Sequence, residues 1–327
     1  MAIEIAVVIQ NSGDATSHYR GYGPMNALKK SYGVNIKRLA QVTWTDLSDC
    51  DIVYLQRPHT NEHLAVILLA KSCGVKVWCD FDDLLCGLTS DNPAFDYFNA
   101  FAKNVVQAIT LADHVTVSSQ FLLDEYSKYN KSISVVPNAW DDFVHPHPFE
   151  IQKQRSLGNR SVFWRGTDTH IKDLYDVKDE ILSLSKQSAW SFMGFCPWFL
   201  RGAGQKINPM DIINYMAFMQ SIKFDVVAVP LHDSPFNRAK SNIAFLEGAV
   251  AGAVCVAPDF AEWNRPGVVI YGKEKSFTNA VLEALELSQS GTNWGESRNY
   301  IQNFLMLSNV NGKRIAVAEE LSGKKRG

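Results

Sequence analysis

Two series of short β-branched runs, separated by helical patterns, constrain the fold of this chain more than any other feature. In the first series we expect strands at residues 3–9, 51–57, 75–81, 114–119 and 133–137, with helices at 23–33, 62–74, 94–113 and 121–129. The second series predicts strands at 161–166, 190–195, 224–231, 253–258 and 267–272. Such alternation is typical of βαβ units, which build a parallel sheet with helices on both faces. The sequence therefore predicts an α/β fold of two doubly wound, Rossmann-like domains.

A stretch rich in Pro, Asn and charge, PNAWDDFVHPHPFEIQKQRSLGNR, separates the two series. We expect a first domain at residues 1–145, a second at 159–292, and a helical segment at 293–327 that could cross back over the first domain. Two such sheets joined by a linker face each other across a cleft, and ligands bind at the carboxyl ends of their strands. Polar residues that follow strands are therefore the candidate site residues.

Composition excludes several classes of function. A net charge of -2 gives no global attraction to nucleic acid or to an anionic membrane surface. No apolar run reaches the roughly 18 residues that a membrane span requires. The six cysteines form no C-x-x-C pair and no signal peptide precedes the first expected strand, so we expect a reducing, cytoplasmic compartment and no metal site. The oligomeric state is left open.

The stretch FNRAKSNIAFLEGAVAG, residues 236–252, reads as a buried helix with two unexpected charges, Lys240 and Glu247. Seven residues span about 10.5 Å, nearly two helical turns, so both side chains are expected on roughly the same face. An ammonium beside the unpaired N–H groups of the first turn would hold a diphosphate, and a carboxylate two turns later would accept hydrogen bonds from ribose hydroxyls. The spacing predicts a nucleoside diphosphate site, with a surface lysine and a capping glutamate as the structural alternative.

Two loops at strand ends add candidate anion contacts. The Gly/Ser-rich segment 10–24 predicts a loop whose glycines, Gly13 among them, let a ligand approach the backbone, with Arg20 as an anion contact. In FWRGTDTH, Arg165 would present its guanidinium to the cleft, and Gly166 would let a phosphate approach the backbone. A plain surface role is the alternative for Arg165.

The acidic segment CDFDDLL, residues 79–85, allows three interpretations. Asp80 and Asp82 match a metal-chelating D-x-D pair, in which Mn²⁺ or Mg²⁺ bridges the donor phosphates. The same pair matches a phosphatase pattern of a nucleophilic Asp followed by an acid/base Asp, although Leu84 stands where that pattern wants Thr or Val. An N-cap cluster satisfied by backbone amides is the structural alternative.

The segment VPLHDSPFNRAKSNIAFLEGAVAGAVCVAPDF resembles the donor-binding region of retaining glycosyltransferases of the GT-B fold. YLQRP, CDFDDLL followed by NP, ADHVTVSS, VVPNAWD and FWRGTDTH occur in the same order as in compact phage and bacterial members of the glycosyltransferase 4-like group. The resemblance covers about residues 5–272, and the order of the motifs carries it.

This resemblance implies a nucleotide-sugar donor, commonly UDP-linked, that the second domain holds without an obligatory metal. Glu247 matches the family's ribose-binding glutamate, and Arg165 matches its phosphate-binding arginine. The family has an earlier glutamate where this chain has Ala239, so Asp233 or Arg238 would have to contact the sugar in its place. The turn that meets the diphosphate corresponds to Ser241, Asn242 and Ile243.

On the acceptor side of the cleft, the resemblance implies that Asp82 or Asp83 positions the attacking hydroxyl or contacts the transferred sugar. Arg165 and Lys240 would stabilise the leaving diphosphate. No general base is assigned, because the donor phosphate often receives the acceptor's proton in retaining members. The remaining acceptor-side candidates are Arg20, Asp80 and Gly13.

Phage-like sequence character suggests a hydroxymethylated pyrimidine in phage DNA as the acceptor, modified by a phage-encoded enzyme in the host cytoplasm. A glycan or lipid-linked acceptor is the alternative. Two other functions stay open, a phosphatase that uses the Asp80 and Asp82 pair and a protein that binds nucleotide sugars without catalysis.

Overall fold

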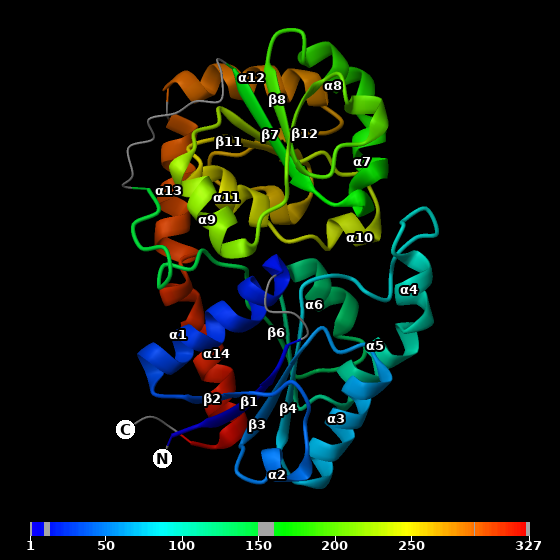
Figure 1. Cartoon of the computed structure of the whole chain (residues 1–327), viewed down its shortest axis with the longest axis vertical. Coiled ribbons are helices and arrows are strands. Elements are labelled where there is room, and N and C mark those ends of the chain that lie inside the picture. Colours follow the sequence, from blue (N-terminus) through cyan, green and yellow to red (C-terminus); the bar gives the residue numbers. More distant parts are fainter. Residues whose placement is uncertain (1, 10–13, 150–159, 291, 325–327) are drawn as a thin grey trace.

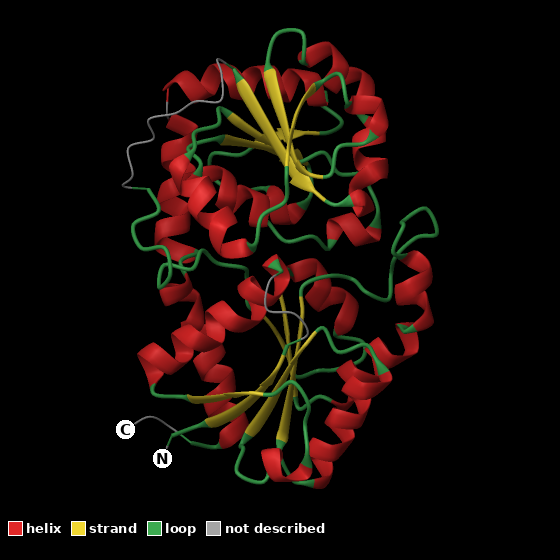
Figure 2. Cartoon of the chain, viewed as in Figure 1, coloured by secondary structure: helices red, strands yellow, loops and turns green. Residues whose placement is uncertain are grey.

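The structure is a computed structural model that describes residues 2–9, 14–149, 160–290 and 292–324. It consists of two α/β domains stacked along the long axis of the molecule (Figure 1). In each domain helices cover both sides of a central sheet (Figure 2). This arrangement confirms the predicted fold class, two Rossmann-like domains. Residues 150–159, where the sequence predicts the junction, lie outside the described part of the chain.

The first sheet is fully parallel and has the order β2-β1-β3-β4-β5-β6. Its strands are β1 (Glu4–Val8), β2 (Asn35–Arg38), β3 (Ile52–Gln56), β4 (Lys76–Phe81), β5 (His114–Val117) and β6 (Ile133–Val135). The helices are η1 (Ser17–Tyr22), α1 (Gly23–Tyr32), α2 (Trp44–Leu47), α3 (Asn61–Ser72), α4 (Phe95–Ala100), α5 (Ala102–Leu111) and α6 (Gln120–Tyr126). Strand order reverses between β1 and β3, which is where such a sheet binds ligands.

The second sheet is also parallel, in the order β12-β11-β10-β7-β8-β9. Its strands are β7 (Ser161–Gly166), β8 (Ala189–Gly194), β9 (Gly204–Ile207), β10 (Val226–Ala228), β11 (Val254–Pro258) and β12 (Val269–Tyr271). The helices are η2 (Asp168–His170), α7 (Ile171–Asp176), α8 (Lys178–Leu184), η3 (Trp198–Leu200), α9 (Ile212–Ser221), α10 (Pro235–Arg238), α11 (Ile243–Val250), η4 (Ala261–Trp263) and α12 (Phe277–Ser290). Here the order reverses between β7 and β10.

Two C-terminal helices connect the domains. Helix α13 (Thr292–Phe304) packs on α11 and α12, and α14 (Leu307–Ser322) packs on α1 and β3 of the first domain. Ile315 and Ala318 of α14 are buried in the same cluster as Ile5 and Trp78. Burying an isoleucine side chain such as that of Ile315 stabilises the fold by about 1.5–3 kcal/mol, so α14 contributes directly to the core of the first domain.

Apolar residues correctly predicted the central strands, but the structure corrects several other predicted elements. Strands β2 and β9 were not expected, because both are largely polar edge strands. The expected helix at 94–113 is divided into α4 and α5 at Phe101. Residues 17–22, expected as a loop, form the helical turn η1. No helix in the described residues is long and apolar enough to cross a membrane.

Candidate active site

A cavity of about 150 Å³, here called the cleft cavity, lies between the carboxyl ends of the two sheets. Strand ends of both domains contribute to it, together with the start of α11. Its position agrees with the rule that open α/β sheets bind ligands outside the carboxyl ends of their strands. The charged and ionisable residues that line it are Arg57, Asp82, Asp83, Arg165, His170 and Lys240.

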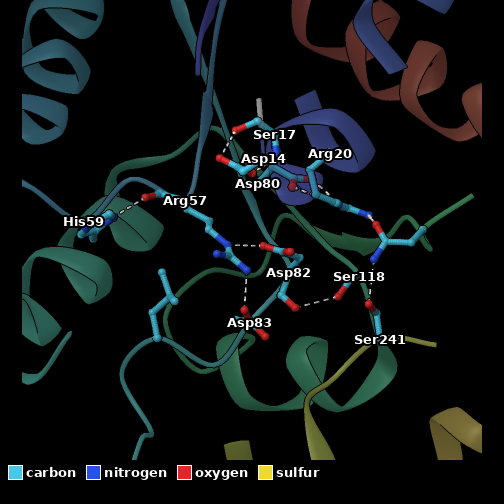
Figure 3. Close-up of polar contacts among 12 residues, drawn as sticks. Asp14, Ser17, Arg20, Arg57, His59, Asp80, Asp82, Asp83, Ser118 and Ser241 are labelled. Atoms are coloured by element: carbon cyan, nitrogen blue, oxygen red, sulfur yellow. Dashed lines mark hydrogen bonds and ion pairs between the residues drawn. The ribbon is translucent and has the colours of Figure 1, made fainter. Parts of the chain in front are cut away.

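On the first-domain side, Arg57 holds the two neighbouring carboxylates together (Figure 3). Its Nε donates to Asp82 and its Nη2 donates to Asp83. Arg57 directly follows β3 and has a φ of 48°, a left-handed conformation that costs a non-glycine residue about 1–3 kcal/mol. The backbone is fixed on both sides, since the Arg57 N–H donates to the Asp80 carbonyl at 2.8 Å and the Arg57 carbonyl lies 2.6 Å from His59 Nδ1.

An ion pair crosses the cleft from Asp83 to Lys240, with 2.8 Å between Oδ1 and Nζ. Burial raises the pKa of the Asp83 carboxyl, but Lys240 and Arg57 outweigh it and the net shift is downward. At Asp82 burial dominates, and the charge of Asp83 adds to it, so its pKa is raised despite Arg57. Asp83 is therefore the firmly ionised member of the pair, and Asp82 takes up a proton more readily.

Lys240 does not stand on the helix that the sequence predicts. The expected helix 236–252 is broken into α10 and α11, with the N-cap of α11 at Asn242. Contacts with the first domain hold the connecting segment, because Lys240 reaches Asp83 and the Asn138 amide donates to Ser241 Oγ at 2.7 Å. The predicted helical spacing of Lys240 and Glu247 is wrong, although Lys240 lines the cleft cavity as expected.

Glu247 lies at the centre of a buried hydrogen-bond network and is 1% exposed. Arg165 Nε donates to its Oε2 at 2.7 Å, and the Tyr215 hydroxyl donates to the same oxygen at 2.8 Å. Tyr19, from η1 of the first domain, donates to Oε1 at 3.1 Å. Burial, followed by the charge of Glu247, raises the pKa of both tyrosines, so both hydroxyls stay protonated donors.

A second cavity of about 350 Å³, here called the apolar cavity, adjoins the first. Arg165 lines both cavities, so the two lie next to each other at this side chain. Apolar walls with a few convergent polar groups are typical of small-molecule sites. The residues that line it include Met193, Pro209, Met210, Ile212, Tyr215 and Glu247.

At the start of α11, Ser241 and Ile243 line the cleft cavity, whereas Asn242 does not. Asn242 is 1% exposed, and its backbone amide interacts with the Glu262 carboxylate. Burial raises the pKa of Glu262 to about 7, against the opposing effect of Arg265. The expected turn is thus present, with Ser241 and Ile243 facing the cavity and Asn242 directed inward.

Arg20 and Asp80 form a structural pair, and they do not line the cleft cavity. Arg20 is fully buried, and its Nε and Nη2 donate to the two oxygens of Asp80 at 2.9 and 2.7 Å. The Thr116 hydroxyl donates to Asp80 at 2.6 Å, and Arg20 Nη1 donates to the Val136 carbonyl at 2.6 Å. This pair corrects the predicted anion contact at Arg20. Asp80 lines neither the cleft cavity nor any other cavity next to it, so the structure gives no support to Asp80 as a metal ligand or phosphatase nucleophile.

The other predicted residues have mixed outcomes. Asp233 and Arg238 pair with each other at 2.6 and 2.8 Å on the surface and line neither cavity, so the proposed sugar contact has no support.

Gly166 lines the apolar cavity, and a Cβ there would lie 2.7 Å from the Trp164 ring. Gly13 lies outside the described residues. Within those residues, no group of three or more His, Cys, Asp or Glu side chains is arranged to hold a metal.

Sequence reasoning missed Arg57, Tyr19 and Tyr215 as site residues. Arg57 directly follows a strand, so the strand-end rule used for Arg165 could have found it. Nothing in the sequence marks the tyrosines as site residues, because both contact Glu247 from distant parts of the chain. Tyr19 is 228 residues from Glu247 in the sequence, and Tyr215 is 32 residues from it.

No family model and no curated protein matches this sequence. Solved structures match it along nearly its whole length. Similar structures include HepE from Anabaena in complex with UDP-glucose, at 15% identity and a TM-score of 0.64, covering 98% of this chain and 100% of that chain. An α,α-trehalose-phosphate synthase (UDP-forming) from Burkholderia vietnamiensis has 12% identity and a TM-score of 0.65, covering 98% of each chain. A glycosyltransferase from Rickettsia africae has 12% identity and a TM-score of 0.63, covering 99% and 100%.

The chain has the two-domain GT-B fold. A UDP-N-acetylglucosamine 2-epimerase also has a similar fold, at 13% identity and a TM-score of 0.57. The match covers 100% of this chain and 98% of the epimerase. The fold therefore does not by itself determine the reaction, which depends on the residues of the site.

Proposed function

We propose that this protein is a glycosyltransferase that moves a sugar from a UDP-linked donor to a hydroxyl acceptor. The observation that carries the proposal is the combination of two cations, Arg165 and Lys240, with the start of α11 at one cavity, beside an apolar cavity that contains Glu247. Helix N-termini with nearby cations bind phosphates, because their first N–H groups have no partner within the helix. Solved structures of the same fold include complexes with UDP and UDP-glucose, which favours a uridine donor.

In this proposal the donor lies across both cavities. The uracil base occupies the apolar cavity, and the diphosphate lies between Arg165, Lys240 and the N–H groups at the start of α11. Glu247 accepts from the ribose: a carboxylate has about four acceptor sites, and protein donors use three of them here. The sugar then faces Asp82 and Asp83 on the first-domain side.

Chemistry in this arrangement depends on charge stabilisation. As the bond between the anomeric carbon and the phosphate oxygen lengthens, negative charge grows on the diphosphate, and Arg165 and Lys240 are already positioned beside it. Asp82 and Asp83 accept hydrogen bonds from the sugar or from the attacking hydroxyl. We propose retention of anomeric configuration, with the donor phosphate taking the acceptor's proton. The anomeric proton coupling of the product, measured by NMR, tests the stereochemistry.

For the acceptor we propose a hydroxymethylated pyrimidine in DNA, with a glycan or lipid-linked hydroxyl as the competing class. Purified protein is incubated with a pool of UDP-sugars and duplex DNA containing 5-hydroxymethylcytosine, and the digested nucleosides are weighed by mass spectrometry. A pentose or hexose mass shift supports both donor and acceptor. Slow UDP release without a shift supports the transferase and rejects the DNA acceptor, and binding of UDP-sugars without any UDP release favours a non-catalytic protein.

Removal of divalent metal is expected to leave turnover unchanged. The reason is that Arg165 and Lys240 supply the positive charge at the diphosphate, while the Asp82 and Asp83 carboxylates are committed to Arg57 and Lys240. UDP release is measured with EDTA and again after addition of Mn²⁺. Loss of activity that Mn²⁺ restores would contradict this account and favour metal chelation at the acidic segment.

A further inference from the structure

His170 is held in a fixed orientation at the wall of the cleft cavity. It ends η2, and its Nδ1 lies 2.7 Å from Oδ2 of Asp173 on the first turn of α7. Asp173 is 3% exposed, and its other oxygen accepts from the His232 N–H at 2.8 Å and from the Asn237 amide at 2.7 Å. Because the carboxylate accepts all three bonds, Nδ1 of His170 carries a proton.

The imidazole ring is fixed by packing as well. Its edge meets the Trp164 ring, with centroids 6.4 Å apart and planes at 84°. A Cβ at Gly166 would approach His170 Cδ2 to 3.1 Å, so the glycine leaves room for this ring position. A side chain locked by packing and by a hydrogen bond from behind is preorganised for a task at its free end.

That free end is Nε2. Among the described residues no hydrogen-bond partner for Nε2 is found, and the ring lines the same cavity as Arg165, Lys240 and Asp83. Asp173 on α7 contacts the ring at Nδ1, and Arg57 of the first domain lines the same cavity.

We propose that His170 is a further catalytic residue, whose Nε2–H donates a hydrogen bond to the leaving phosphate. This rests on the glycosyltransferase function proposed above. The bond between the anomeric carbon and the β-phosphate oxygen breaks, and its electron pair stays on that oxygen. The acceptor hydroxyl bonds to the anomeric carbon and gives its proton to the phosphate, while His170 keeps both ring protons, one on Nδ1 toward Asp173 and one on Nε2 toward the phosphate. Asp173 is a positioning residue, since it acts through His170.

Two substitutions separate this role from a structural one. His170→Asn keeps a polar group near Nδ1 but removes the donor at Nε2, whereas the amide of His170→Gln reaches the Nε2 position. We expect His170→Asn to lower kcat for UDP-sugar turnover or donor hydrolysis by about 10²–10³-fold, with a change in KM below about tenfold. His170→Gln is expected to retain more activity than His170→Asn.

UDP affinity, measured by calorimetric titration, provides the second readout. His170→Asn is expected to bind UDP more weakly than wild type, because it lacks the donor at the Nε2 position, and His170→Gln is expected to lie between the two. Normal UDP binding with the same kcat in wild type and both variants would overturn the inference alone. Failure of the wild-type protein to bind UDP would overturn it together with the proposed function.

Discussion

Replacing Lys240 by methionine is expected to weaken UDP binding by about 2–5 kcal/mol, or roughly 30-fold to several thousand-fold. The side chain is 20% exposed and lines the cavity in which the diphosphate is proposed to lie. Methionine keeps most of the length of the lysine and its packing over the Phe236 ring, from which Nζ lies 4.1 Å. Asp83 keeps Arg57 as a partner, so the fold is expected to remain intact.

Calorimetric titration with UDP measures this effect, and circular dichroism checks the fold. Lys275→Met is the matched control, because Lys275 also pairs with a carboxylate, Glu283, but lines neither cavity. The control is expected to bind UDP as the wild-type protein does. Equal affinity of Lys240→Met and wild type would remove Lys240 from the donor site.

Glu247→Gln is expected to abolish discrimination between UDP and 2′-deoxy-UDP. If Glu247 accepts from the ribose, the wild-type protein should prefer UDP by about 1.5–3 kcal/mol, the usual contribution of a hydrogen bond to a charged group. Glutamine keeps the shape of the side chain but loses the charge that Arg165 and the two tyrosines share. Overall UDP affinity should fall as well, because Arg165 loses its carboxylate partner.

Glutamine is a better replacement than alanine in this test, because Glu247 also supports the fold. Glu247→Ala leaves the Arg165 cation without its partner and is expected to cost about 3–5 kcal/mol of folding free energy, so a loss of binding there would be ambiguous. The comparison of UDP with 2′-deoxy-UDP in Glu247→Gln is internal to one variant and does not depend on its stability. Glu283→Gln is the matched control. A preference for UDP that persists in Glu247→Gln would contradict ribose recognition by this residue.

Sequence pattern predicted the central strands because their apolar residues are buried on both faces, as in β3, where all five residues are buried. It failed at β2, whose NIKR sequence lies at an edge of the first sheet with mainly exposed side chains. An edge strand needs pairing on one side only and can be polar. The same reasoning applies to β9, GQKI, at the edge of the second sheet.

The ends of the expected strands predicted several residues that line the site, but the sequence did not show which side chains pair with each other. Arg165, near the end of β7, and Asp83, two residues after β4, line the cleft cavity as expected. No local pattern could show that Asp80 is engaged by Arg20, which is 60 residues away, while its neighbours Asp82 and Asp83 face the cleft. The break before α11 was missed for a related reason, since contacts of Lys240 and Ser241 with the first domain hold that segment.

A crystal structure of the protein with UDP would show whether a uridine nucleotide binds between Arg165, Lys240 and Glu247. We expect the diphosphate at the start of α11 within hydrogen-bond distance of Lys240, the ribose at Glu247 and the base in the apolar cavity. UDP bound elsewhere, or a diphosphate that contacts neither Arg165 nor Lys240, would contradict this expectation.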